Sequence, residues 1–283
     1  MDIPKIIHYC WFGYNKKSDK IFNCMETWHE FLSDYKIIEW NENNCDINSS
    51  NYASRAYNKK KWAYVADYFR FKILYEYGGI YLDTDMQINK NLDNFLLYDA
   101  FFAMECYEWV NGGIIGAKPR SNVIQKIFNN YENNKYQSFD GTICHRITRV
   151  LIDDYFLKQT GDTQILNDNI AVFSPNILTI NIDDGKNYCE HIYDNNISWL
   201  NNNNKVFAEG ETWKYTVLQR YFYNLYKKTE ITTDKSSFIL SYEIKNMLLY
   251  YSAKRLLWQI IKEYFRHILP NWLLRIYKCN KLV

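Results

Sequence analysis

The cysteines of this sequence are scattered and form no recognisable framework. The seven cysteines are an odd number, and no two of them make a Cys-x-x-Cys pair. This pattern indicates neither a disulfide-stapled secreted domain nor a zinc ribbon. The N-terminus, Met1-Asp2-Ile3-Pro4-Lys5, also lacks the basic and then apolar layout of a signal peptide. We therefore expect a cytoplasmic protein in a reducing environment.

The sequence has almost no net charge to attract a polyanion. Its 34 Lys and Arg face 32 Asp and Glu, a net charge of +2, so we expect no nucleic-acid partner. Residues 236–283 carry eight Lys and Arg against Glu243 and Glu263, without the run of roughly 18 apolar residues that a membrane span needs. This segment predicts amphipathic helices, broken at Pro270, that either lie peripherally on the inner face of the membrane or pack against the rest of the protein.

Apolar and aromatic residues are plentiful. The sequence is 47% apolar and 18% aromatic, which excludes a mostly disordered protein and permits a large core. The length of 283 residues fits one main domain with an appendage. We expect the main domain in residues 1–235 and a basic, aromatic-rich helical region in residues 236–283.

Local patterns predict a βαβ unit near the N-terminus. Residues 5–12 are a nearly unbroken apolar and aromatic run that ends at Gly13, which predicts a buried strand. A helix is expected next, with Ser18 as its N-cap, and residues 36–40 predict a second strand. The unit implies an α/β fold with a mostly parallel sheet, whose ligands bind beyond the carboxyl ends of the strands.

Further elements follow from the same kinds of pattern. We expect a helix over residues 61–77, strands over 101–105 and 112–117 around a turn that contains Asn111, helices over 121–132 and 142–157, a strand over 170–173, a loop at the four asparagines 201–204, and a helix over 211–227.

Two carboxylates follow the strand that comes after Gly78 and Gly79. In an extended segment Asp83 and Asp85 would point the same way, about 6.5 Å apart. Two ionised carboxylates at that separation repel by roughly 2.5 kcal/mol at an effective dielectric of about 20. A divalent cation would turn the repulsion into attraction, whereas an isolated Asp-x-Asp can also be a pair of solvated residues.

The helix over residues 61–77 has two charged faces. With Asp67 as the reference, Lys72 and Glu76 lie at about 140° and 180°, whereas Arg70 lies at about −60°. Asp67 and Arg70 therefore stand apart from the solvent face, among apolar residues where an unpaired charge is costly. They are either an intrahelical ion pair or a pair that faces a pocket next to Asp83 and Asp85.

These residues resemble the DXD-containing sugar transferases of glycosyltransferase family 32. The resemblance rests on the opening strand over residues 3–13, on the strand end Trp40-Asn41-Glu42, and on the helix and DXD strand over residues 62–85. A further block over residues 191–199 resembles the family's distal His and Ser-Trp motif, with an unusual interior. Residues 3–120 carry most of the resemblance.

The resemblance implies a GT-A fold, a manganese or magnesium ion, and retaining transfer of a hexose or N-acetylhexosamine from a nucleotide-sugar. UDP-sugars are the favoured donors, and the acceptor would be a glycan or a lipid-linked saccharide. Relatives of this type include bacterial transferases of capsule, O-antigen or other surface polysaccharide synthesis and the catalytic domains of large clostridial glucosylating toxins.

The resemblance also implies roles for individual residues, and chemistry supports several of them. Asp83 and Asp85 would bind the metal as catalytic residues, and His191 could supply a third ligand. The implied contacts to the donor are Trp11 on the base, Asp67 on sugar hydroxyls, Arg70 on the sugar or diphosphate, Tyr81 on the ribose, Ser198 and Trp199 on the phosphates, and Asn111 in the sugar or acceptor pocket.

Two other classes of protein remain as alternatives. A haloacid-dehalogenase-like phosphatase also uses Asp-x-Asp after an apolar strand, but there the motif usually closes the first strand, whereas here Asp83 follows a βαβ unit and a helix. The other alternative is a catalytically inactive sugar-binding or assembly protein.

Overall fold

The structure is a computed structural model of the chain, and it describes residues 2–105, 108–132, 142–182 and 184–193. The chain divides into two compact units, Met1–Tyr221 and Phe222–Val283, and every described residue belongs to the first. The expected boundary at residue 235, the helix over 211–227 and the C-terminal helices lie outside the described residues. Among the residues described, no helix is both long enough and apolar enough to span a bilayer.

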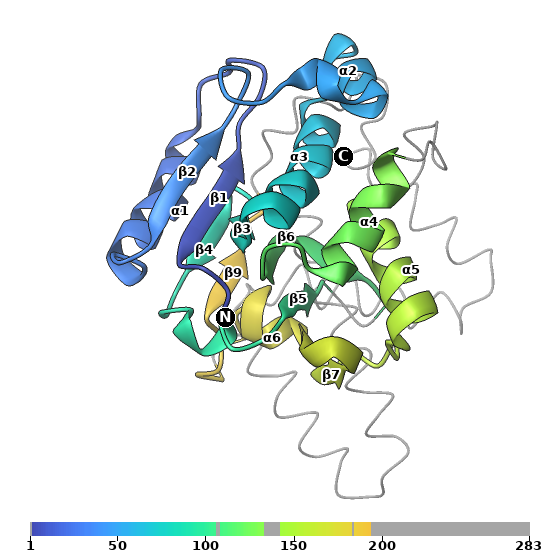
Figure 1. The fold of residues 1–283 in the computed structure, drawn as a ribbon. Helices are drawn as coiled ribbons and strands as arrows, with labels where there is room; N and C mark the ends of the chain where they lie inside the picture. Colours follow the sequence, from blue (N-terminus) through green and yellow to red (C-terminus); the bar gives the residue numbers. More distant parts are fainter. Residues whose placement is uncertain (1, 106–107, 133–141, 183, 194–283) are drawn as a thin grey trace, which may run out of the picture. The chain divides into compact units, whose positions relative to one another are not determined.

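A seven-stranded mixed sheet lies at the centre of the first unit (Figure 1). The strands are β1 (Ile6–Cys10), β2 (Lys36–Trp40), β3 (Gly79–Leu82), β5 (Ala100–Met104), β6 (Val110–Ala117), β7 (Gln164–Leu166) and β8 (Ile170–Phe173), in the order β2-β1-β3-β6-β5-β8-β7. β6 runs antiparallel to β3 and β5, and β7 runs antiparallel to β8, while the other pairings are parallel. Most strands therefore share one direction, which confirms the expected α/β fold with a mostly parallel sheet and is consistent with the GT-A class.

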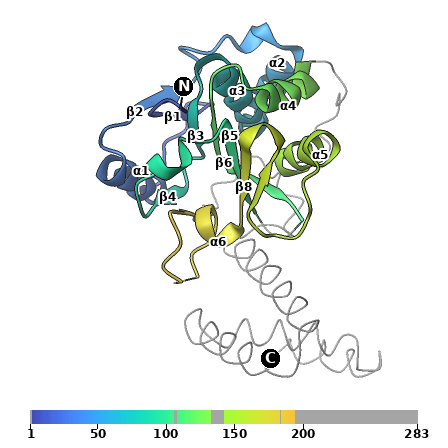
Figure 2. The ribbon, with the colours of Figure 1, turned by 60° about the horizontal axis from the view of Figure 1, so that its bottom comes forward.

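Helices cover both faces of the sheet (Figures 1 and 2). One face carries α2 (Asn51–Asn58), α3 (Trp62–Tyr77), α4 (Asn122–Glu132) and α5 (Ile143–Tyr155), and the other carries α1 (Asp19–Phe31), α6 (Pro175–Leu178) and the two-stranded ribbon of β4 (Met86–Ile88) and β9 (Cys189–His191). Neighbouring strand residues alternate between the two cores, since Phe101 packs in one apolar cluster and Phe102 in the other.

The first βαβ unit forms as the sequence predicts. Ser18 caps α1, because its side chain accepts a hydrogen bond from the backbone N–H of Ile21 at 3.3 Å. β1 and β2 are parallel and in register from Ile6 opposite Lys36 to Cys10 opposite Trp40. The carboxyl ends of β1, β2 and β3 therefore meet at one edge of the sheet.

Two glycines join α3 directly to β3. Gly78 and Gly79 have φ angles of 64° and 101°, which residues with a side chain rarely adopt. A Cβ atom on Gly79 would also lie 2.6 Å from the carbonyl oxygen of Ile6 on the neighbouring strand. The glycines thus end the helix within one residue of the strand that leads to Asp83.

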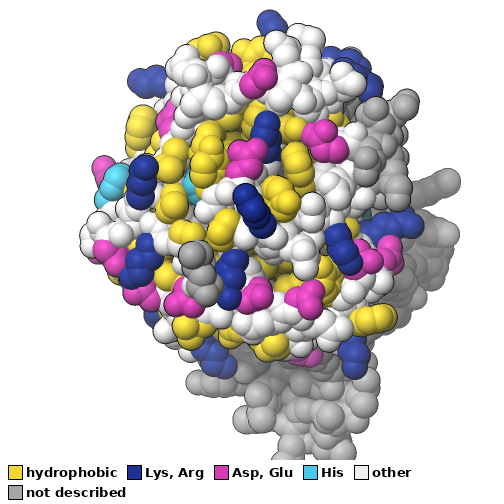
Figure 3. Space-filling view, viewed as in Figure 1, with side chains coloured by type: hydrophobic (Ala, Val, Ile, Leu, Met, Phe, Trp, Pro, Cys, Tyr) yellow, Lys and Arg dark blue, Asp and Glu magenta, His cyan; other side chains and the backbone are white. Residues whose placement is uncertain are grey.

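Among the described residues, five short helices and strands and one position differ from the sequence-based expectation. The elements α2, β4, β7, α6 and β9 were not predicted, and Asn111 lies within β6 instead of in a turn. The space-filling view shows acidic and basic side chains interspersed among apolar ones on the face seen in Figure 3, which agrees with the low net charge.

Candidate functional site

A tight turn separates the two carboxylates of the Asp-x-Asp motif. β3 ends at Leu82, and the backbone N–H of Met86 donates to the carbonyl oxygen of Asp83 at 3.0 Å. The prediction that residues 83–85 continue as an extended segment is therefore wrong, because the chain turns there to enter β4. Asp83 stays attached to the sheet, since its backbone N–H donates to the carbonyl oxygen of Gly113 at 2.8 Å.

The pairing of β4 with β9 brings His191 to this turn. The two strands are antiparallel, with Met86 opposite His191. The backbone N–H of Ile192 donates to the carbonyl oxygen of Asp85 at 3.0 Å, and that of His191 donates to Thr179 at 2.8 Å. His191 is therefore held by its backbone on both sides, next to a motif that is remote from it in sequence.

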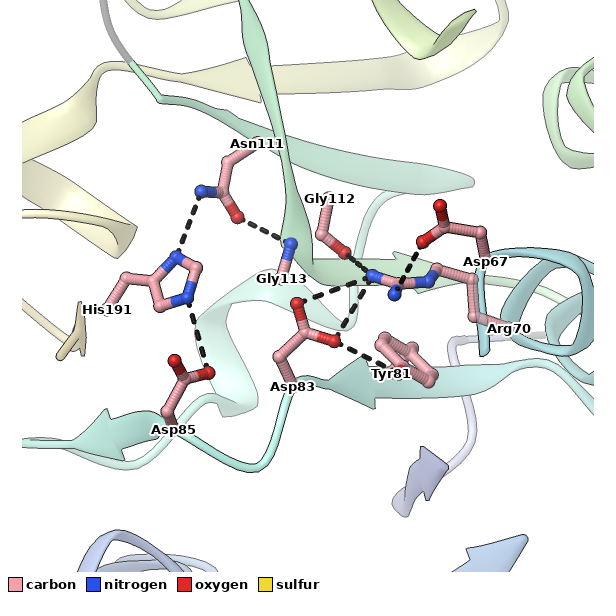
Figure 4. Close-up of polar contacts among 9 residues, drawn as sticks. All are labelled: Asp67, Arg70, Tyr81, Asp83, Asp85, Asn111, Gly112, Gly113 and His191. Atoms are coloured by element: carbon pink, nitrogen blue, oxygen red, sulfur yellow. Dashed lines mark hydrogen bonds and ion pairs between the residues drawn. The ribbon is translucent and has the colours of Figure 1, made fainter. Parts of the chain in front are cut away.

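The side chains of Asp83, Asp85 and His191 lie close together (Figure 4). One possible ligand atom from each residue lies within 4.8 Å of the others, and Nε2 of His191 is 3.2 Å from Oδ1 of Asp85. The three side chains are 30%, 18% and 13% exposed, so the group is partly desolvated and still open to a ligand. Two carboxylates and an imidazole are suitable donors for a divalent cation such as Mn²⁺ or Mg²⁺.

Arg70 on α3 connects this group to Asp67. Its guanidinium lies 2.9 Å from the carboxylate of Asp67 and 3.3 Å from that of Asp83, and it donates to the carbonyl oxygen of Gly112 at 2.5 Å. Both interpretations of the second charged face of α3 therefore hold, because the intrahelical ion pair also faces the Asp-x-Asp turn. The guanidinium also stacks 4.4 Å above the ring of Tyr81.

Burial and neighbouring charges shift the titration of these groups. Burial raises the pKa of Asp67 to about 6, although Arg70 opposes the shift. Burial disfavours the charge of Arg70, but the neighbouring acidic groups, Asp83 first among them, together outweigh burial and raise the pKa of Arg70. Burial likewise disfavours the charge of His191, yet Asp85 raises the pKa of its imidazole. A bound cation would reverse this last effect, since it repels a proton on the ring.

The other residues that the sequence singled out lie at different depths. Trp11 follows the last residue of β1 at the carboxyl edge of the sheet and is partly exposed, with its indole N–H donating to the carbonyl oxygen of Asn15 at 2.7 Å. Tyr81 is only 1% exposed, and its hydroxyl donates to Asp83 at 3.1 Å. Tyr81 thus supports Asp83 from the core. Ser198 and Trp199 lie outside the described residues.

A polar layer behind His191 was only partly foreseen. Asn111 is 1% exposed and contacts both Gly113 and His191. Tyr193 stacks on the imidazole with ring centroids 3.9 Å apart, and its hydroxyl reaches Glu105 at 3.5 Å. Tyr193 was not predicted, because it lies beyond β9 with a left-handed φ of 55° and no pattern in the sequence indicates its contact with His191.

One family model matches part of the chain. Residues 18–102 match the family model described as "Glycosyltransferase sugar-binding region containing DXD motif". Asp67, Arg70, Asp83 and Asp85 lie inside this segment, whereas Trp11, Asn111 and His191 lie outside it.

Two curated relatives and one solved structure show similarity to parts of the chain. An uncharacterized glycosyltransferase of Acanthamoeba polyphaga mimivirus is 34% identical over 140 residues, which are 45% of this chain and 55% of the relative. Inositol phosphoceramide mannosyltransferase 3 of Schizosaccharomyces pombe is 30% identical over 136 residues, 45% of this chain and 37% of the relative. The solved structure named PaToxG Glycosyltransferase matches with a TM-score of 0.45 at 18% identity, over 54% of this chain and 69% of that one. The chain thus spans about half or less of the length of these two curated relatives.

Proposed function

We propose, from the premise that residues 18–102 are a glycosyltransferase sugar-binding region of the DXD type, that this protein is a metal-dependent, retaining glycosyltransferase. It moves a hexose or N-acetylhexosamine from a nucleotide-sugar, with UDP-sugars favoured, to a glycan or lipid-linked saccharide. The single observation that carries the proposal is the convergence of Asp83, Asp85 and His191 beside Arg70. The finer placement in family 32 and a part in surface polysaccharide synthesis are included in this proposal.

The proposed roles of the residues concern two parts of the donor, its diphosphate and its sugar. Asp83 and Asp85 would hold a divalent cation, with His191 as the third member of the group, and the cation would supply positive charge to the leaving diphosphate. Arg70 is buried and carries a fixed positive charge next to Asp83, where it also attracts the diphosphate or the sugar. Asp67 accepts hydrogen bonds from sugar hydroxyls when it is ionised.

Three further residues complete the proposed set of donor contacts. Trp11 offers a partly exposed indole to the base at the carboxyl edge of the sheet. Ser198 and Trp199 would cover the phosphates and exclude water. We assign no protein nucleophile, because in same-face transfer the leaving phosphate oxygen can accept the proton of the acceptor hydroxyl.

The names of the relatives guide the choice of acceptor and donor to test. The S. pombe relative is named as a mannosyltransferase of inositol phosphoceramide. A lipid-linked acceptor is compatible with a peripheral position on the cytoplasmic face of the membrane, which is part of this proposal. A donor panel should therefore include mannose and glucose donors with both uridine and guanosine diphosphate.

Hydrolysis of the donor in the absence of acceptor tests the proposal. With Mn²⁺ we expect slow release of nucleoside diphosphate by the wild type and at least a hundredfold slower release by Asp83→Asn and Asp85→Asn, since each loses a charged group at the diphosphate. Asp99→Asn is a matched control, because Asp99 pairs with Lys118 just before β5 begins, at the opposite edge of the sheet. No turnover and no binding of nucleoside diphosphates across the panel would refute the enzyme proposal and favour an inactive sugar-binding or assembly protein.

The phosphatase alternative has less support from the fold. The Asp-x-Asp motif follows β3, after a complete βαβ unit and α3, instead of closing the first strand. A phosphatase would release inorganic phosphate from simple esters. Such release, lost in Asp83→Asn while donor turnover persists, would favour the phosphatase.

A further inference from the structure

The side-chain amide of Asn111 has a defined orientation next to His191. The backbone N–H of Gly113 lies 2.5 Å from Oδ1 of Asn111, in a buried part of β6. Because a backbone N–H can only donate, the amide atom that faces it must be the oxygen. The amide nitrogen is therefore the atom that lies 3.2 Å from Nδ1 of His191 (Figure 4).

This orientation determines which ring nitrogen of His191 carries its proton. An amide nitrogen is a donor only, so Nδ1 must accept its hydrogen bond. The proton of the neutral ring then sits on Nε2, which lies 3.2 Å from the carboxylate of Asp85. A proton on Nδ1, in the other neutral tautomer or in the imidazolium, would face the N–H donor of Asn111. Turning the amide over would instead leave the buried N–H of Gly113 facing a donor.

We propose that Asn111 is a positioning residue that keeps His191 in the Nε2–H tautomer, so that His191 orients Asp85 by a hydrogen bond and does not coordinate the cation. The inference rests on the proposed function, which supplies the cation. A protonated Nε2 has no lone pair for a metal, so the protein ligands are the carboxylate oxygens of Asp83 and Asp85. An all-oxygen set reduces the preference for Mn²⁺ over Mg²⁺ that an imidazole ligand would give.

The surroundings of His191 support a fixed ring. Its backbone is hydrogen-bonded to Thr179, and Tyr193 stacks on the imidazole at 3.9 Å with an interplanar angle of 22°. The ring is therefore held in place while Asn111 and Asp85 contact its two nitrogens. Carboxylates that bind a metal are commonly hydrogen-bonded by groups of the outer shell, which is the place that the inference gives to His191.

His8 provides an internal reference for the same tautomer. The indole N–H of Trp40 donates to Nδ1 of His8 at 3.1 Å, and Nε2 of His8 lies 2.8 Å from the carbonyl oxygen of Gly78. An obligatory donor on one side and an obligatory acceptor on the other assign the proton to Nε2. Burial lowers the pKa of His8 to about 4, so this ring is neutral near pH 7.

The first test is nitrogen NMR of the histidine rings in the full-length, metal-free protein. We expect the His191 signals, assigned by their loss in His191→Gln, to show the Nε2–H pattern seen for His8. In Asn111→Asp an acceptor replaces the amide nitrogen, so the pattern of His191 should shift to Nδ1–H while that of His8 stays unchanged. An Nδ1–H pattern for His191 in the wild type would overturn the inference, whether or not the variant folds.

The second test measures the metal directly. Pulsed EPR of wild-type protein with Mn²⁺ and UDP should show no coupling from a directly coordinated imidazole nitrogen, and His191→Gln should leave the spectrum unchanged. A coordinated-nitrogen signal that disappears in His191→Gln would refute the inference. If Mn²⁺ does not bind at all, the proposed function fails, whereas the NMR result still decides the tautomer.

Discussion

Replacement of Arg70 by methionine tests the polar centre of the site most severely. Arg70 is 3% exposed and pairs with Asp67 at 2.9 Å and Asp83 at 3.3 Å. Methionine preserves much of the side-chain volume but leaves the carboxylates of Asp67 and Asp83 without the positively charged guanidinium. Removal of one partner from a buried ion pair typically costs about 3–5 kcal/mol. We expect a loss of that size in the free energy of unfolding at pH 7.5.

Part of this loss of stability should depend on pH, and the titration of Asp67 determines the direction of that dependence. The pKa of Asp67 is raised from 3.8 to about 6, so even with Arg70 present the fold loses stability as the pH rises from 3.8 to about 6, and this loss stays constant above that pH. Without Arg70 the pKa of Asp67 rises further. At pH 7.5 the variant therefore loses up to about 2 kcal/mol more stability than the wild type, because each of the roughly 1.5 pH units above 6 costs about 1.36 kcal/mol. At pH 5 Asp67 is protonated in both proteins, and this extra cost disappears.

Urea unfolding followed by circular dichroism at pH 7.5 and pH 5 measures both parts of the loss. The matched control is Lys118→Met, which breaks the partly exposed ion pair of Lys118 with Asp99 at 2.6 Å. A solvent-exposed pair contributes about 1 kcal/mol or less. If Arg70→Met lost no more stability than Lys118→Met, the assignment of Arg70 as a buried partner of two carboxylates would be wrong. A loss independent of pH would show that Asp67 is not the charge left behind.

Three further predictions concern the donor, the helix–strand junction and the cation. UDP-sugar should bind more tightly than UDP, and this difference in affinity should shrink as the pH falls through about 6, because Asp67 then loses the charge that accepts hydrogen bonds from sugar hydroxyls. Calorimetry measures both affinities, and the comparison with UDP cancels effects of pH on the cation. Gly79→Ala should lower the free energy of unfolding by at least about 3 kcal/mol, because the new Cβ would lie 2.6 Å from a backbone oxygen. Gly185→Ala should lower it by only about 1 kcal/mol, because Gly185 has a similar positive φ of 72° but open space around it. Equal losses in the two variants would contradict the steric argument. A chelator should abolish donor hydrolysis and added Mn²⁺ should restore it; activity that survives chelation would exclude a metal-dependent reaction.

The elements of the first βαβ unit could be predicted because their hydrophobic patterns are local. β1, α1 and β2 follow from one apolar run, one N-cap at Ser18 and one short strand pattern, and the structure confirms all three. The two charged faces of α3 likewise revealed the pair of Asp67 and Arg70. Such signals depend on residues within a few turns of one another.

The missed parts depend on contacts that are distant in sequence. β4 and β9 have three residues each and exist through mutual pairing, so neither carries a pattern of its own. The strand expected over residues 112–117 begins earlier, at Val110, and within it a Cβ on Gly112 would meet the side chain of Ile143 at 2.8 Å. This glycine serves close packing of α5 on the sheet, and Asn111 is consequently a strand residue.

The ribbon of β4 and β9 also determines when the site can form during folding. Asp83 and Asp85 follow α3 and β3 at once, so these two carboxylates can be positioned as soon as the first strands assemble. His191 reaches them only after the chain has completed β5, β6, β8 and α6, and it is held there by two strands of three residues. Closing this long loop costs chain entropy, and only the few backbone hydrogen bonds between β4 and β9 offset that cost. We therefore expect the carboxylates to be in place before His191 docks, so that an intact Asp85–His191 contact marks the completion of folding in this unit.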